Sequence, residues 1–148
     1  MKFKKFLPII LFIIVFVVII IFLWPRGYVK QVILRSKIFT VETVDTQALL
    51  EKGLSGRSLL APDEGMLFVF QKPDKYGFWM KDMNFPIDII WISPDFRIVS
   101  IEKSVSPSTY PTIFSSKEAS LYVLEISAGE ADKIGAKIGD MVTFVKKH

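Results

Sequence analysis

The stretch Gly65–Trp91 most constrains how this chain can fold, because three short apolar runs follow one another in it with only turn-forming residues between them. The runs are Met66–Phe70, Phe78–Met80 and Ile87–Trp91. Proline stands in both gaps together with glycine or asparagine, and these residues favour turns. Apolar runs of this length between turns are typical of strands. The sequence therefore predicts a β-rich core centred on this stretch.

Alternation within two of the predicted strands places carboxylates among apolar side chains. In the run 87–92, period-two spacing puts Asp88 on the same face as Ile90 and Ile92. In the run 121–126, Glu125 shares a face with Leu121 and Val123. A buried carboxylate needs a cation or several hydrogen-bond donors, because an unpaired one is costly. The nearest partners in the sequence are Arg57, Lys81 and the indole N–H of Trp79.

The rest of the chain predicts further strands and two short helices. Apolar runs at 31–34 and 38–44 are expected to form a hairpin, and Ser93-Pro94-Asp95-Phe96 predicts a turn between strands 87–92 and 97–105. Ser104–Ser120 is expected to be a long surface loop. One helix is expected from Asp45 or Thr46 through Glu51, with Leu49 and Leu50 buried. A capping-box pattern at Ser127 predicts another helix to Ile134. A last strand is expected over 141–145. The class is α+β and β-rich, with a bent antiparallel sheet or a small, partly open barrel.

A different structure is expected before this domain. Leu7–Trp24 contains no charged residue, and it is long enough to cross a bilayer core of roughly 30 Å as a helix. A cleavable signal peptide is the alternative, but its apolar region is about 7–15 residues long and ends in small residues. Here the run ends Phe22-Leu23-Trp24-Pro25-Arg26. We interpret residues 1–25 as a cytoplasmic stub and transmembrane signal anchor, 26–37 as a basic juxtamembrane linker or first strand, and 38–148 as the globular domain.

The charges divide at the same boundary. Residues 1–37 carry seven of the 19 basic residues and no acidic one, which leaves 19 − 7 = 12 basic against 15 acidic residues in 38–148. The globular part is therefore mildly acidic and has no basic stripe, so no nucleic-acid partner is expected. The lysine cluster Lys2, Lys4 and Lys5 directly before the apolar run predicts a domain outside the cytoplasm. The absence of cysteine shows that no disulfide stabilises the domain.

Residue supply excludes several kinds of active site. The only histidine is His148 at the chain end, and there is no cysteine, so histidine-paired nucleophiles and zinc sites lack candidates. No motif implies a cofactor or a metal. We name no catalytic residue, and an enzymatic role is not favoured.

The remaining candidates are charged groups close to aromatic and sulfur side chains. We expect a cleft lined by Arg57, Trp79, Met80, Lys81, Asp82 and Asp88, with Glu125 as buried polar support. The main hypothesis is a module that binds a small polar or saccharide-like ligand. One alternative is a carboxylate-based hydrolase that uses two of Asp82, Asp88 and Glu125. Another is a structural or assembly role, in which the loop Ser104–Ser120 or an apolar edge binds a neighbouring membrane protein.

Several motifs in order resemble one family. They are GLSGR (53–57), GMLFVF (65–70), FWMKDM (78–83), PIDIIWI (86–92), RIVSIE (97–102), VLEISAG (123–129) and GD (139–140). This order resembles domain of unknown function 192, here in a membrane-anchored member. The resemblance implies a small β-rich domain, often behind a signal or membrane segment, with no established activity. Asp82 and Met83 depart from the family's FWMKNT-like segment, and Asp82 adds a negative charge beside the expected cleft.

Overall fold

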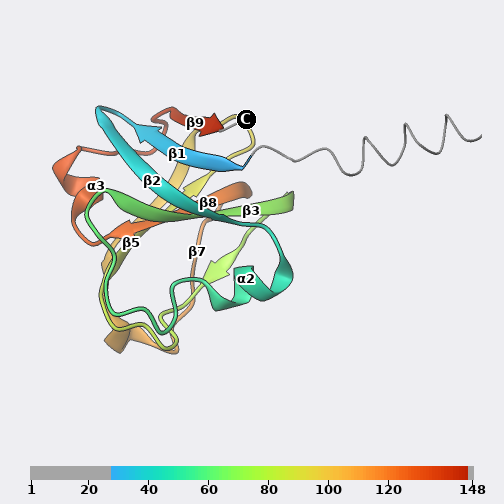
Figure 1. Ribbon diagram of the computed structural model, residues 1–148. Helices are drawn as coiled ribbons and strands as arrows, with labels where there is room; N and C mark the ends of the chain where they lie inside the picture. The colour runs from blue at the N-terminus through green and yellow to red at the C-terminus, as the bar shows by residue number, and fades with distance from the viewer. Residues whose placement is uncertain (1–27, 147–148) are drawn as a thin grey trace, which may run out of the picture.

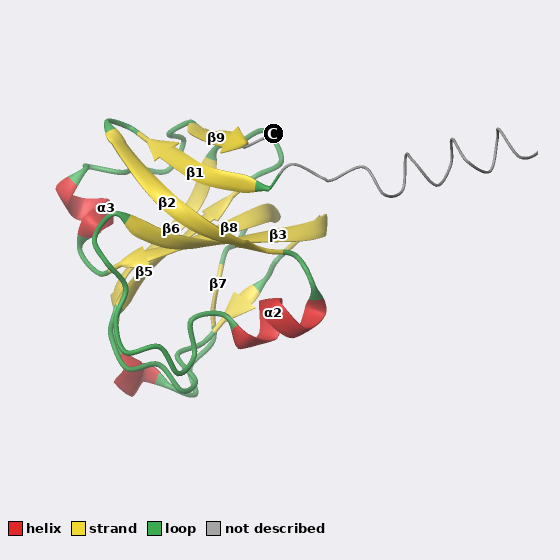
Figure 2. Cartoon of the chain, viewed as in Figure 1, coloured by secondary structure: helices red, strands yellow, loops and turns green. Residues whose placement is uncertain are grey.

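The computed structural model describes residues 28–146. The predicted membrane anchor at residues 7–24 lies outside this range. Within residues 28–146, no helix is both long enough and apolar enough to cross a bilayer. Strands dominate this part of the chain, and the helices are few and short (Figure 2).

Seven strands form one curved sheet (Figure 1). Its order is β6-β5-β8-β3-β2-β1-β9, and every neighbouring pair is antiparallel except β2 and β3, which are parallel. The strands are β1 (Val29–Leu34), β2 (Lys37–Val44), β3 (Glu64–Asp74), β5 (Ile87–Ile92), β6 (Ile98–Val105), β8 (Ser120–Ser127) and β9 (Val142–Lys146). The sheet is not closed, although a bridge between Arg97 and Met141 ties its two outermost strands at one end.

The two faces of the sheet bury two separate apolar clusters. Ile90 and Ile92 of β5 pack on one face with Leu124 and Ile126 of β8. Ile89 and Trp91 alternate to the other face, where Met66 and Phe68 of β3 join them. The face assignments made from period-two alternation are therefore confirmed for both strands. Consequently Asp88 and Glu125 extend from opposite faces of the sheet.

The connection between β2 and β3 covers the second face. Parallel neighbours need a crossover connection, because the chain must return to the same end of the sheet. This crossover carries α2 (Gln47–Lys52), and its Leu54 packs fully buried against the cluster of Phe68 and Trp91. A small two-stranded sheet of β4 (Gly77–Phe78) and β7 (Phe114–Ser115), together with the 3-10 turn η2 (Pro107–Thr109), belongs to the remaining loops. Figure 1 shows α2 and β7 on the same side of the large sheet.

Both predicted hairpins form. β1 and β2 pair through a turn at Arg35 and Ser36, so part of the segment 26–37 is a strand. β5 and β6 pair through Ser93–Phe96, where the amide of Phe96 donates to the carbonyl of Ser93 at 3.0 Å. The expected strands at 121–126 and 141–145 correspond to β8 and β9.

Three local predictions differ from the structure, wholly or in part. Phe78–Met80 was expected to be a strand, but β4 ends at Phe78, since Trp79 turns to the surface and Met80 enters the core. The expected buried face of the first helix forms only in part: α2 has no fully buried residue and Leu49 is exposed, but Leu50 is half-buried and packs against the second apolar cluster.

The capping box predicted at Ser127 is the third difference. Helix α3 (Glu130–Lys133) begins after Gly129, whose left-handed backbone provides no side-chain cap. The Ser127 hydroxyl donates instead to the carbonyl of Leu60 at 2.7 Å. Glu130 is buried and accepts hydrogen bonds from Lys37 and Lys133. These lysine contacts hold the pKa of Glu130 below its ordinary value.

Candidate functional site

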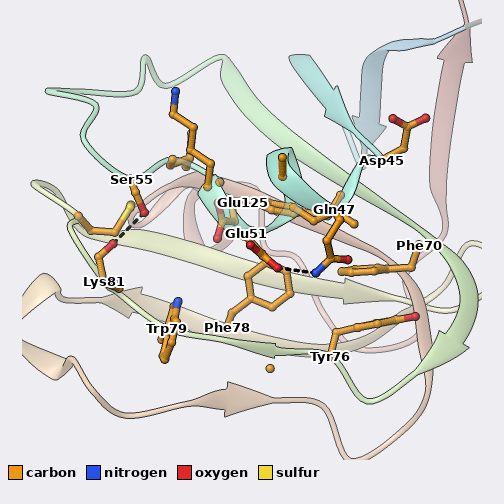
Figure 3. A pocket seen from close by; sticks show the side chains of 18 of the residues that line it. Asp45, Gln47, Glu51, Ser55, Phe70, Tyr76, Phe78, Trp79, Lys81 and Glu125 are labelled. Atoms are coloured by element: carbon orange, nitrogen blue, oxygen red, sulfur yellow. Dashed lines mark hydrogen bonds between the residues drawn. The ribbon is translucent and has the colours of Figure 1, made fainter.

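A cavity of about 1280 Å³ lies between the sheet and the β2–β3 crossover. The crossover supplies one wall through α2 and Ser55, and β3 supplies another through Phe68 and Phe70. The segment after β4 contributes Trp79, Lys81 and Asp82. Figure 3 shows Ser55 and Lys81 towards one end of the cavity, Phe70 and Tyr76 towards the other, and Glu125 between them.

Two loops that are distant in the sequence are joined beside this cavity. The Ser55 hydroxyl donates to the carbonyl of Lys81 at 2.8 Å, and the amide of Gly56 donates to the carbonyl of Asp82 at 2.8 Å. The Asn84 amide donates to the carbonyl of Arg57 at 2.8 Å. Asp82 adopts a φ of 56°, a left-handed conformation that is uncommon outside glycine. The loops 53–57 and 78–83 therefore form one connected wall, which fixes Lys81 and Asp82 near the crossover.

Aromatic rings form most of the apolar surface. Phe78 packs edge to face against Phe68 at 4.9 Å and against Trp91 at 5.9 Å between ring centroids. Phe70 stacks on Tyr76, and the indole N–H of Trp91 donates to the carbonyl of Tyr76 at 2.9 Å. These buried and half-buried rings are thus held by packing and by one hydrogen bond, which gives the cavity a preformed aromatic wall.

Trp79 differs from these rings because half of its surface is exposed. It contacts Tyr110 edge to face at 6.0 Å between ring centroids. It lies at the edge of the cavity, where a bound molecule could cover it.

Glu125 is the one charged side chain of the cavity that is buried. It lies on β8 between Met66 of β3 and Ile89 of β5, and it is only 5 % exposed. Within residues 28–146 its Oε2 atom has no hydrogen-bond partner, although the atom itself is fully buried. Buried polar atoms nearly always have a partner, so an orphaned carboxyl oxygen beside a cavity requires a reason.

Burial also changes the chemistry of this group. Loss of hydration raises the pKa of Glu125 to about 8, and the Arg57 guanidinium opposes this rise only in part. The Arg57 side chain forms its ion pair with Glu42 instead, at 2.5 Å between Nη2 and Oε2. Glu125 is therefore mostly protonated at neutral pH, and it can donate one hydrogen bond and accept others.

Asp88 is fully buried as well, but its oxygens are occupied. It accepts hydrogen bonds from the amides of Ser104 at 2.7 Å, Gly129 at 3.1 Å and Ala131 at 2.8 Å. These bonds tie β5 to the end of β6 and to the start of α3. The hydrogen-bond donors expected for a buried carboxylate are therefore backbone amides. Asp88 has a structural role on the face of the sheet away from the cavity.

The predicted cleft residues do not all meet. Trp79, Lys81 and Asp82 line the cavity together with Glu125, which was expected only as support. Met80 is a buried core residue, and Asp88 lies on the opposite face of the sheet. Arg57 lies next to the cavity wall and is engaged by Glu42.

Other lining residues were missed by sequence reasoning. Gln47 and Glu51 of α2 reach the cavity and are joined by a 2.6 Å hydrogen bond, and Phe70 and Tyr76 complete its far end. The i,i+4 spacing of Gln47 and Glu51 was an unused signal that the two side chains would be neighbours on a helix. Nothing in the sequence indicated that this helix would lie over the Glu125 face. In the described range 28–146, no cluster of three or more histidine, aspartate or glutamate side chains could hold a metal ion.

Two proteins of solved structure have a fold similar to this one. A protein of unknown function from Novosphingobium aromaticivorans is 32 % identical, with a TM-score of 0.74 over 82 % of this chain and 89 % of that one. A protein from Sinorhizobium meliloti, described as a candidate transcription regulator, is also 32 % identical, with a TM-score of 0.75 over 80 % of this chain and 95 % of that one. No curated protein matches the chain. The family DUF192, described as an uncharacterized ACR, matches residues 30–144, well over half of the sequence. The chain therefore belongs to the DUF192 family.

Proposed function

We propose that the chain is a membrane-tethered, extracytoplasmic module that binds a small polar, saccharide-like ligand in the Glu125 cavity. The observation that carries this proposal is the buried Oε2 atom of Glu125, which has no partner in residues 28–146 and lies at the wall of a large aromatic cavity. A folded protein retains such a costly group when the group has a use.

The surroundings of Glu125 suit a hydroxylated ring. A neutral carboxyl can donate to one hydroxyl and accept from another. The exposed face of Trp79 offers an apolar surface to the C–H face of a sugar, and Lys81 and Asp82 lie on the same wall. A few polar groups on an aromatic surface are typical of small-ligand sites.

The tether rests on the sequence. The uncharged run Leu7–Trp24 follows the cluster Lys2, Lys4 and Lys5, as in a retained signal anchor with an extracytoplasmic domain. Fractionation of cells that express the full chain tests this part directly. Carbonate washing should leave the chain in the membrane, and protease added to the outer side of that membrane should digest the domain.

Ligand binding can be followed by tryptophan fluorescence of the full-length chain in mild detergent. A panel of sugars, peptides and cell-wall fragments is added, and the Trp79→Phe variant identifies the signal that comes from Trp79. A true ligand should change Trp79 emission and raise the melting temperature. Glu125→Gln keeps the shape but loses the carboxyl, so it should weaken binding several-fold, whereas Glu118→Gln, on an exposed segment outside the cavity, should not. A panel without any such ligand would remove the main support for the proposal.

One observation favours a second candidate, a carboxylate-based hydrolase. A carboxyl that stays protonated at neutral pH is what a general acid requires, and Asp82 lines the same cavity. Glu125 would protonate the leaving group while Asp82 activates water. Asp88 has no part in this scheme because it lies on the other face of the sheet. Release of product by the native chain, lost in Glu125→Gln with binding retained, would distinguish hydrolysis from binding alone.

A further inference from the structure

A second cavity, of about 620 Å³, lies on the other face of β3, where β1 begins. Its apolar floor is a cluster of three rings. Phe96 stacks on Tyr122 at 5.6 Å between centroids, and Phe144 packs edge to face against Phe96 at 5.3 Å and against Tyr122 at 4.9 Å. We call this the β1 groove, defined by Tyr28, Val69, Phe96, Tyr122, Met141 and Phe144.

The rim of the β1 groove exposes large apolar side chains. Tyr28 is 58 % exposed, Met141 51 % and Phe96 39 %. Lys146 also lines the groove and lies opposite Val29 in the β1–β9 register, and Asp45 contributes one negative charge. Exposed apolar groups around a hollow mark a surface that another molecule covers.

The position of Tyr28 in the sequence limits what that molecule can be. Tyr28 follows the apolar run Leu7–Trp24 after only Pro25, Arg26 and Gly27. Four fully extended residues span at most about 14 Å. The headgroup layer on each side of a bilayer is about 5–8 Å thick. If the run crosses a bilayer, Tyr28 at one end of the rim lies in this layer or within several ångströms of it.

We propose that the β1 groove faces the membrane and rests on the lipid surface, with Tyr28, Phe96 and Met141 in contact with lipid. Tyrosine is enriched at this depth, and Lys146 is positioned to meet anionic headgroups. The inference rests on the tether of the proposed function but not on its ligand. It would orient the domain on the membrane and fix how the mouth of the Glu125 cavity is presented.

The absence of cysteine from the sequence allows a direct test. Met141→Cys places a single thiol on the rim of the groove, and Leu59→Cys places one at a site that is 68 % exposed and outside both cavities. Each full-length variant is labelled with an environment-sensitive fluorophore and reconstituted into vesicles of phosphatidylcholine and phosphatidylglycerol. Some of the lipid carries a spin label near its headgroup, which quenches only nearby fluorophores.

We expect several-fold stronger quenching at position 141 than at position 59, together with a blue-shifted emission. Phe96→Cys should behave like Met141→Cys, which guards against a local effect of one substitution. Equal quenching at 141 and 59 would overturn the proposal. A blue shift at 141 without lipid quenching would also overturn it, because protein, either Trp24 of the same chain or a second copy, would then cover the groove. Loss of the chain from the vesicles on carbonate washing would overturn both the groove and the tether while leaving the Glu125 site to its own test.

Discussion

Replacing Glu125 by glutamine gives the sharpest test of how the cavity is built. The amide has nearly the same shape as the carboxyl but cannot ionise. In the native chain the carboxyl is buried without a partner in the described residues, so ionisation is disfavoured as long as the domain is folded. In the unfolded chain it ionises near its ordinary pKa of 4.5. The variant therefore removes a pH-dependent penalty on folding.

The size of this penalty follows from the two pKa values. With a pKa of 4.5 unfolded and about 8 folded, the native state holds the proton that the unfolded state releases, so stability falls as the pH rises from 4.5 and levels off above 8. Linkage gives a loss of roughly 3 to 4 kcal/mol between about pH 5 and pH 8 from this one group. Glutamine does not ionise, so the unfolding free energy of the variant should not show this fall. The difference in unfolding free energy between the variant and the native chain should therefore rise by the same amount across this pH range.

Urea unfolding of the full-length chain in mild detergent, followed by near-ultraviolet circular dichroism, measures the effect. The difference in unfolding free energy between variant and native chain is plotted against pH, so that contributions from other groups cancel. Glu118→Gln replaces an exposed carboxylate and serves as the matched control. Its difference in unfolding free energy from the native chain should not change with pH. Parallel pH profiles for Glu125→Gln and the native chain would refute the reasoning, since Glu125 would then have a partner or ready access to water.

Three other outcomes follow from the described contacts. Asp88→Asn should lower the unfolding free energy by about 3 kcal/mol in urea titration, because one of the two carboxyl oxygens that together accept three backbone amides becomes an NH2 group, which cannot accept. Asp63→Asn on the surface should change it by less than about 0.5 kcal/mol. Gly65→Ala should cost about 2 kcal/mol in the same assay, since a Cβ there would lie 2.9 Å from the backbone oxygen of Glu125; an unchanged midpoint would show that β3 and β8 can separate freely. Arg57→Met should raise the pKa of Glu125 further, which carboxyl carbon NMR can follow, and a lower pKa would contradict the assigned role of the guanidinium.

The face of each central strand could be predicted because alternation is a local property. In β5 and β8 the side chains alternate strictly, and both buried carboxylates were placed correctly from that pattern alone. Their partners could not be predicted in the same way. The donors to Asp88 come from residues 16 to 43 positions away, and they are backbone amides, which every residue carries.

The residues that line the cavity could likewise be predicted only where a local sequence pattern indicated them. Trp79, Lys81 and Asp82 stood out because charge follows an aromatic residue, and they do lie together. Arg57 was expected to pair with a buried carboxylate, but the parallel pairing of β2 with β3 brings Glu42 opposite Met66 and within reach of the guanidinium. Parallel pairing depends on contacts between distant strands, so no local pattern in the sequence indicated that Glu42 would take Arg57 and leave Glu125 alone.

The parallel pair β2–β3 has one more consequence. Any chain that makes this pair must carry its crossover from one end of the sheet to the other, and here the crossover Asp45–Asp63 passes over the face that holds Glu125. The strand topology thus places the crossover as one wall of the cavity, and the sheet forms the opposite wall. Insertions or deletions in the crossover could therefore change the volume of the cavity from one relative to the next without changing any hydrogen bond between the strands of the sheet.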